Sequence, residues 1–133
     1  MTAGARVLRT TPAVGGGDPN PAAESPWVDV CAFDDLVPDR GVAALVGSHQ
    51  VAVFRVSPGD ELYALSNYDP FSRAFVLSRG IVGSRGEVPK VASPMYKQAF
   101  DLRTGQCLDD PSVSVPTFAV RVVAGRVQVA APC

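Results

Sequence analysis

The chain has 133 residues and a mass of 13.9 kDa, with 47% hydrophobic and 19% charged residues. This length suits one compact domain, and the composition predicts a packed core rather than a disordered chain. The formal net charge of -1 and the pI near 5.7 give no long-range attraction for nucleic acid or anionic membranes. No apolar run approaches the roughly 18 residues of a membrane-spanning helix, and no secretory signal is visible, so we expect a cytoplasmic protein.

The first part of the chain is rich in Gly, Pro, Ala and Thr, and it contains the run Gly15-Gly16-Gly17. Such a segment buries too little apolar surface to offset the entropy of ordering it. We therefore predict a flexible tail over residues 1–26 and one folded domain over residues 27–133.

Short strand patterns separated by turn residues follow. Asp34 is the expected N-cap of a single helical turn that ends at Pro38. Many short strands spaced by turns predict an all-β fold, an antiparallel β-sandwich or a small barrel. The predicted strands cover residues 27–31, 41–46, 50–56, 61–65, 117–123 and 126–130.

The middle of the chain, residues 67–97, is long, loop-like and rich in Gly, Ser, Pro and Arg. A compact domain seldom keeps such a segment without a purpose, so we expect the function to lie there. The alternative is a structural insertion that packs on the sheet.

The cysteine pattern gives little support for a metal-binding or redox role. They are widely spaced, odd in number and outside any C-x-x-C pair, which argues against a disulfide framework or a metal site. No Ser/His/Asp set is expected either, because the single histidine, His49, falls in a predicted hairpin turn. The cysteines are Cys31, Cys107 and Cys133.

Two stretches resemble the cluster-binding loops of a Rieske domain, in which C-x-H and C-x-x-H motifs hold a [2Fe–2S] cluster. In residues 64–71, Asp69 and Phe71 stand at the Cys and His places of the first loop. In residues 91–105, Ser93 and Tyr96 stand at those of the second. The resemblance implies a Rieske-like β-sandwich or small barrel with an inserted two-loop subdomain.

All four ligand positions depart from the Rieske pattern. Phe71 cannot bind a metal, and the oxygen donors of Asp69, Ser93 and Tyr96 suit an iron–sulfur cluster poorly. We therefore expect no cofactor and no metal in this chain. We predict that Phe71, Met95 and Tyr96 pack together in the vacated space, and that Asp69 and Ser93 bind loop amides.

The amino-acid sequence of this segment is similar to that of the small subunits of assimilatory NAD(P)H-dependent nitrite reductases. The resemblance implies a large-subunit partner with FAD, an iron–sulfur cluster and sirohaem, which reduces nitrite to ammonium with electrons from NADH or NADPH. It also implies a heteromeric complex in which this chain is an accessory subunit, not catalytic alone. The stretches that carry the resemblance are residues 67–71, 76–83, 91–95 and 97–100.

Two other functions stay open: a Rieske-type electron-transfer component of an oxygenase, and a free-standing binding module on the same scaffold. The missing ligands argue against the first of these. The second predicts a stable chain without a larger partner.

Basic residues dominate the middle segment, with five between positions 69 and 97 against two acidic residues. Arginine among small residues is suited to reach carboxylates on another surface. We therefore predict that this segment docks on the large subunit, the alternative being a solvated loop whose charges only aid solubility. The candidate docking residues are Arg73, Phe75, Arg79, Ile81, Val82, Arg85 and Lys97.

Overall fold

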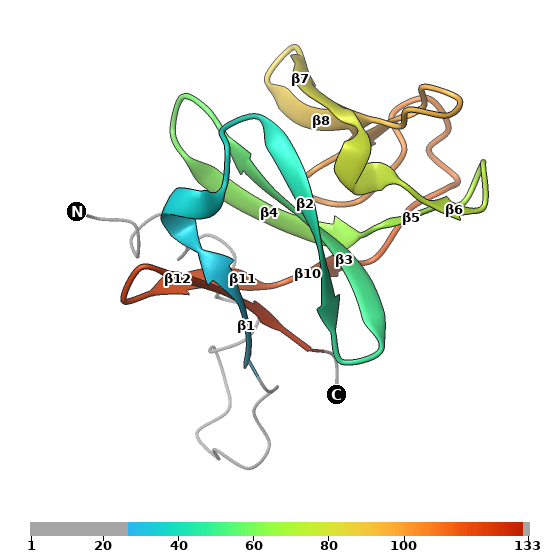
Figure 1. Ribbon diagram of the computed structural model, residues 1–133. Coiled ribbons are helices and arrows are strands. Elements are labelled where there is room, and N and C mark those ends of the chain that lie inside the picture. Colours follow the sequence, from blue (N-terminus) through green and yellow to red (C-terminus); the bar gives the residue numbers. More distant parts are fainter. Residues whose placement is uncertain (1–26, 132–133) are drawn as a thin grey trace, which may run out of the picture.

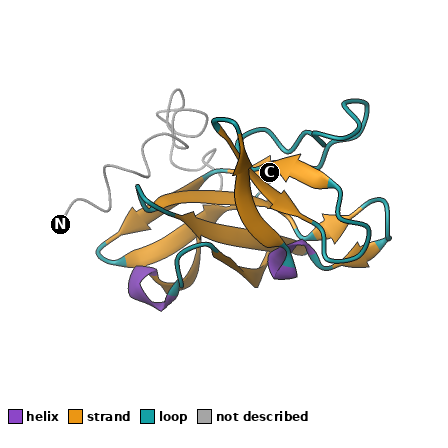
Figure 2. Ribbon diagram, turned by 90° about the horizontal axis from the view of Figure 1, so that it is seen from above, coloured by secondary structure: helices purple, strands orange, loops and turns teal. Residues whose placement is uncertain are grey.

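The computed structural model describes residues 27–131, so the tail predicted for residues 1–26 lies outside the described residues. Strands make up most of the regular structure, and the helical elements of the described part are two short 3-10 turns (Figure 2). Within that part, no helix is long and apolar enough to cross a membrane.

The first antiparallel sheet joins the start and the end of the domain (Figure 1). β1 pairs with β12, and β12 forms a hairpin with β11 across Ala124 and Gly125, both of which have positive φ. The 3-10 turn η2 (Phe33–Asp35) follows β1 and is tied to this hairpin by the Phe33 amide, which donates to the Gly125 carbonyl at 2.8 Å. The strands are β1 (Trp27–Ala32), β11 (Val120–Val123) and β12 (Arg126–Ala130).

The second antiparallel sheet has the order β10-β4-β3-β2 and forms the centre of the molecule. β2 and β3 make the expected hairpin over a two-residue turn, Gly47-Ser48, and Gly47 supplies the positive φ of 62° that this turn requires. His49 belongs to β3 rather than to the turn. The strands are β2 (Arg40–Val46), β3 (His49–Val56), β4 (Glu61–Ser66) and β10 (Thr117–Phe118).

A subdomain inserted between β4 and β10 covers the other face of the central sheet. It holds the small hairpin β5–β6, the 3-10 turn η3, and the three-stranded sheet β7-β8-β9 (Figure 1). Its elements are β5 (Tyr68–Asp69), β6 (Ala74–Phe75), η3 (Leu77–Arg79), β7 (Ile81–Arg85), β8 (Val88–Ala92) and β9 (Ala99–Asp101).

Two cores lie on opposite faces of the central sheet. Val51 and Val53 of β3 face the first sheet, whereas Ala52 and Phe54 face the subdomain, and all four side chains are buried. Because successive strand residues point to opposite faces, a strand covered on both sides has an unbroken apolar run, as β3 has. The molecule is therefore three layers deep, an all-β sandwich with an inserted subdomain, as the Rieske resemblance implies.

The structure corrects several expectations. The sheets form separate layers that do not close into a barrel. Asp34 does not cap the first helical turn: Ala32 holds the N-cap position without a side-chain hydrogen bond. The predicted strand 117–123 is two strands, because the chain crosses there from the central sheet to the first sheet.

The middle segment, residues 67–97, is also more regular than expected. It contains four short strands and η3 in place of a long loop. The strand pattern is weak in the sequence because β7 and β8 carry Gly83, Ser84 and Pro89, which have low β propensity.

Candidate functional site

Two loops of the subdomain have the same backbone geometry. The first loop is residues 69–73 (Asp-Pro-Phe-Ser-Arg) and the second loop is residues 93–97 (Ser-Pro-Met-Tyr-Lys). In each, the amide of the last residue donates to the carbonyl oxygen of the first, at 2.7 Å in the first loop and 3.0 Å in the second. The last residue is left-handed in both, with φ of 59° at Arg73 and 66° at Lys97. The loops are therefore equivalent turns that face each other.

A hydrogen bond between Asp69 and Ser93, the residues expected at the Rieske cysteine places, joins these loops. The Ser93 hydroxyl donates to Asp69 Oδ2 at 2.5 Å, and both residues are buried, 1% and 0% exposed. Asp69 also accepts from the Phe71 amide and the Ser72 hydroxyl, both at 2.9 Å. Ser93 Oγ accepts from the Met95 amide at 3.2 Å. The prediction that Asp69 and Ser93 bind loop amides is thus confirmed.

Asp69 is held as an anion by these donors. Burial by itself raises the pKa of its carboxyl, but hydrogen bonds from the Ser93 hydroxyl, the Phe71 amide and Ser72 outweigh it, and the pKa lies below its ordinary value of 3.8. An ionised carboxylate accepts hydrogen bonds and donates none, so it suits a site surrounded by donors.

Phe71 and Tyr96, the residues expected at the Rieske histidine places, have different surroundings. Phe71 packs into the second core against Phe100, with ring centroids 6.1 Å apart. Met95 and Tyr96 are 51% and 60% exposed, so the expectation that they pack with Phe71 is wrong. The two loops are joined directly by the Asp69–Ser93 hydrogen bond.

These residues do not fit a [2Fe–2S] cluster. Such a cluster takes thiolate and imidazole ligands, and none of the four positions offers either. The oxygen atoms of Asp69 and Ser93 are already engaged with each other and with the loops. In residues 27–131, no group of three His, Cys, Asp or Glu side chains could hold a metal ion.

The candidate docking residues fall into two groups. Arg73 and Lys97 end the two loops, and Phe75 follows the first loop in β6, 52% exposed. Ile81, 71% exposed, begins β7 opposite Ala92, the residue before the second loop. These four therefore lie at or near the end of the subdomain that the loops form.

The remaining docking candidates lie elsewhere. Val82 is half-buried against the second core, on the opposite face of β7 from Ile81. Arg85 stands at the far end of β7, roughly 13 Å from Ile81 at strand spacing, and its guanidinium bonds Asp109 at 3.2 Å. Arg79 is exposed in η3 and has no ion pair within the described residues.

Asn67 is a buried residue to which sequence reasoning assigned no role. It is 2% exposed, and its side chain donates to the Phe75 carbonyl at 3.2 Å and accepts from the Ser78 amide at 2.7 Å. Its carbonyl also accepts from the Leu77 amide at 3.0 Å. Asn67 thereby fixes where η3 begins. An Asn at the head of a turn-rich segment is the one signal that could have indicated this.

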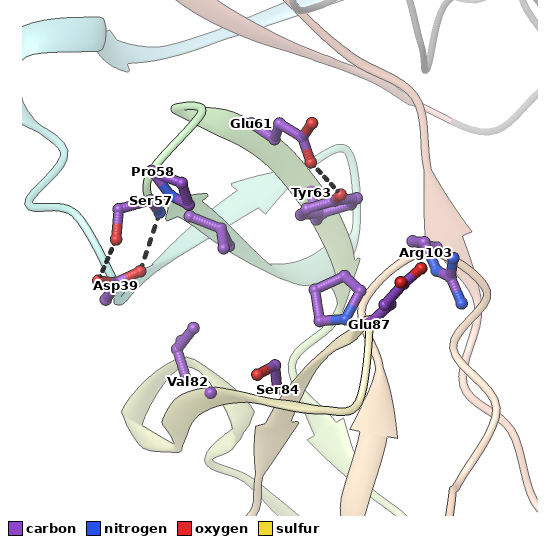
Figure 3. Close-up of a pocket in the computed structure, with 12 residues that line it drawn as sticks. Asp39, Ser57, Pro58, Glu61, Tyr63, Val82, Ser84, Glu87 and Arg103 are labelled. Atoms are coloured by element: carbon purple, nitrogen blue, oxygen red, sulfur yellow. Dashed lines mark hydrogen bonds between the residues drawn. The ribbon is translucent and has the colours of Figure 1, made fainter.

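A pocket of about 710 Å³ separates the β3–β4 turn from the β7–β8 hairpin (Figure 3). Asp39 accepts hydrogen bonds from the amide and hydroxyl of Ser57, which lower the pKa of its carboxyl, and the Tyr63 hydroxyl donates to Glu61 at 2.7 Å. The lining contains no His or Cys that could act as a base or nucleophile. The pocket carries no catalytic constellation.

Comparison with known proteins places this geometry in a family. The profile of the Rieske-like [2Fe-2S] domain matches residues 26–130. The nitrite reductase (NADH) small subunit of Escherichia coli K12 is 45% identical over 104 residues, 78% of this chain and 96% of that protein. A segment of the Klebsiella oxytoca nitrite reductase [NAD(P)H] large subunit is 42% identical over the same share of this chain and 11% of that protein.

Solved structures support the same family. A crystal structure assigned to an NADH-dependent nitrite reductase small subunit of Mycobacterium tuberculosis has a TM-score of 0.79 and 50% identity, covering 82% of this chain and 97% of that one. The ferredoxin of a carbazole 1,9a-dioxygenase from Nocardioides aromaticivorans has a TM-score of 0.70 and 31% identity, covering 81% of this chain and all of that one. The chain belongs to the nitrite reductase small-subunit family, on a Rieske-like fold.

Proposed function

We propose that this chain is the accessory small subunit of an NAD(P)H-dependent nitrite reductase that reduces nitrite to ammonium. It has no redox centre of its own and acts only when bound to a large subunit. The observation that carries the proposal is the pair of loops in which the Asp69–Ser93 hydrogen bond stands in place of cluster ligands.

The partner would be the large subunit, with FAD, an iron–sulfur cluster and sirohaem as the family resemblance implies. The Klebsiella oxytoca large subunit supports this, because it contains a segment 42% identical to this chain within one polypeptide. When a domain occurs fused to a larger chain in one protein and separate in another, the separate form is expected to bind that larger chain.

The same site argues against an electron carrier. A ferredoxin that feeds an oxygenase needs a cluster, and this donor set does not suit one. The free-standing module differs from the proposal only in having no large partner, so an experiment must separate the two.

We place the complex in the cytoplasm, where NADH is available to it. Two free thiols support a reducing compartment: Cys107 is buried and Cys31 is half-buried, and neither forms a disulfide among the described residues.

Co-expression with the large subunit tests the proposal. A tag at Met1 should retain a much larger protein, and the eluate should show flavin and sirohaem absorption bands. The small chain purified alone should be colourless. A lone chain with Rieske-type bands would restore the electron-carrier function, and a lone colourless chain under co-expression would favour the free-standing module.

A further inference from the structure

We infer that one end of the subdomain is the surface that binds the large subunit, and that the matching surface of the partner carries carboxylates around apolar side chains. This inference rests on the proposed function and adds where and how the subunits meet. The surface, called the loop end below, consists of Arg73, Phe75, Met95, Tyr96 and Lys97.

The loop end gathers exposed apolar side chains from both loops. Phe75, Met95 and Tyr96 are 52%, 51% and 60% exposed, although each is large enough to contribute to a core. The Phe75 ring is held by Tyr68, with ring centroids 5.0 Å apart. Aromatic residues and Met are enriched at protein interfaces, and neighbouring exposed apolar groups mark binding surfaces.

Two cations flank these side chains. Arg73 and Lys97 occupy the same position in two equivalent turns, and both are exposed. Neither has an ion pair with a described residue, so both charges are available to a partner. The carboxylate of the first loop, Asp69, is buried and engaged in loop hydrogen bonds.

The charged residues elsewhere in the molecule make its charge distribution uneven. Asp34 and Asp35 are exposed on η2, at the left of Figure 1, whereas the β5–β6 hairpin lies at the right. The loop end is thus positive and the η2 end negative, which favours an acidic partner surface. Four arginines away from the loop end are neutralised within the chain, in the pairs Arg55–Asp60, Arg85–Asp109, Arg103–Asp101 and Arg126–Asp29.

The Asp69–Ser93 bond gives this surface its shape. The loops belong to separate hairpins, 24 residues apart in sequence, and this buried bond joins them. Binding costs less when side chains are already positioned, so a rigid tie between the loops favours association. Asp69 and Ser93 are positioning residues for the loop end.

The test measures the affinity of the tagged full chain for the purified large subunit. The variant Arg73→Glu/Lys97→Glu should raise Kd by at least about tenfold, because like charges then face each other across the interface. The variant Met95→Ala/Tyr96→Ala should raise Kd by a similar factor through lost apolar contact. Wild-type binding should weaken as salt rises, whereas binding of the charge-reversal variant should strengthen, because salt screens the repulsion between like charges.

Matched controls make the same changes elsewhere. Arg40→Glu/Arg126→Glu reverses two exposed cations in β2 and β12, away from the loop end, and Leu45→Ala/Val123→Ala truncates two exposed apolar side chains in β2 and β11. Both controls should bind within about twofold of wild type, since changes outside an interface are nearly neutral. Circular dichroism and thermal melting of each variant identify any that unfold.

The outcomes separate the two proposals. Wild-type binding with loss in both loop-end variants and none in the controls supports the inference. Wild-type binding that survives the loop-end changes overturns the inference and leaves the accessory-subunit function standing. Absence of binding by the wild-type chain overturns the proposed function together with the inference.

Discussion

A carboxylate without exposed surface is costly unless its oxygen atoms accept hydrogen bonds. Asp69 meets this condition through Ser93, Ser72 and the Phe71 amide, and no lysine or arginine pairs with it among the described residues. The hydroxyl of Ser93 has one proton to donate and uses it on Asp69. The two residues are therefore coupled, and a change in one leaves the other unsatisfied.

A double-mutant cycle tests this coupling. Asp69→Ala should lower the free energy of unfolding by about 3 kcal/mol, and Ser93→Ala by about 1.5 kcal/mol, because each leaves buried polar groups without partners. The double variant should lose about 1–2 kcal/mol less than the sum of the single losses. Urea denaturation of the four proteins measures these values. Additive losses would mean that the two side chains do not stabilise each other.

The lowered pKa of Asp69 makes its contribution depend on pH. The folded carboxyl has a pKa below the ordinary 3.8, so around that pH the folded protein binds fewer protons than the unfolded chain. Its stabilisation is complete above the ordinary value and is lost as pH falls through the lowered pKa.

The comparison with Asp69→Asn isolates this carboxyl from the other acidic groups. The difference in unfolding free energy between wild type and Asp69→Asn should be largest near neutral pH and should shrink below about pH 4. Urea denaturation from about pH 7 to about pH 3 measures it. A difference that stays constant across this range would show that Asp69 does not titrate with a lowered pKa.

At the scale of elements, two glycines allow η3 to pack closely between β2 and β8. A Cβ on Gly80 would clash with the Ala92 carbonyl oxygen and lie 2.6 Å from Val91 Cγ2. A Cβ on Gly41 would lie 2.5 Å from the Phe54 ring and 2.6 Å from the Ser78 carbonyl oxygen. Both contacts need glycine because the backbones approach too closely for any side chain.

Gly80→Ala should therefore lower the free energy of unfolding by about 2 kcal/mol through overpacking. Gly83→Ala in the neighbouring strand is its control, since the nearest atom to the added Cβ is the flexible Lys90 Nζ at 3.8 Å. The control should change stability by less than about 0.5 kcal/mol. Thermal or urea unfolding measures both. Equal effects of the two variants would contradict the close packing of η3.

The elements that were predicted correctly depend on local signals. The β2–β3 hairpin has an apolar run on each side of the turn and Gly47 in it, and the β11–β12 hairpin has Ala124-Gly125, so both could be located from sequence. β7 and β8 could not, because Gly83, Ser84 and Pro89 have low β propensity and hide the strand pattern, although the two strands pair across a short hairpin. The break at Ala119 depends on the chain changing sheets, which has no local pattern.

The site was predictable in position but not in geometry. The motif spacing predicts which residues stand at the Rieske ligand positions, namely Asp69, Phe71, Ser93 and Tyr96. The side chains of these residues argue against binding of an iron–sulfur cluster. Nothing in the spacing shows that Asp69 and Ser93 meet at 2.5 Å. The prediction that Tyr96 is packed against Phe71 rests on the idea that bulky side chains fill the space of an absent cluster. In the structure Tyr96 is exposed, and the Asp69–Ser93 hydrogen bond joins the two loops.

For the whole molecule, the three layers explain how a Rieske-like subdomain can keep its place without thiolate and imidazole cluster ligands. The central sheet supports it from one side through a buried core that includes Leu65, Phe100 and Leu102. At roughly 1.5–3 kcal/mol for each large apolar side chain buried, this core is a larger source of stability than a single loop hydrogen bond. The fold therefore does not depend on the loops as its main source of stability, which is compatible with the proposed binding role of the loop end.

Hydrogen–deuterium exchange of the chain, alone and bound to the large subunit, tests the central claim most directly. The amides of residues 71–75, 93 and 95–97 should exchange more slowly in the complex, because the loop end is covered, while those of β1, β11 and β12 should be unchanged. Protection of the first sheet or η2, with none at the two loops, would contradict the account.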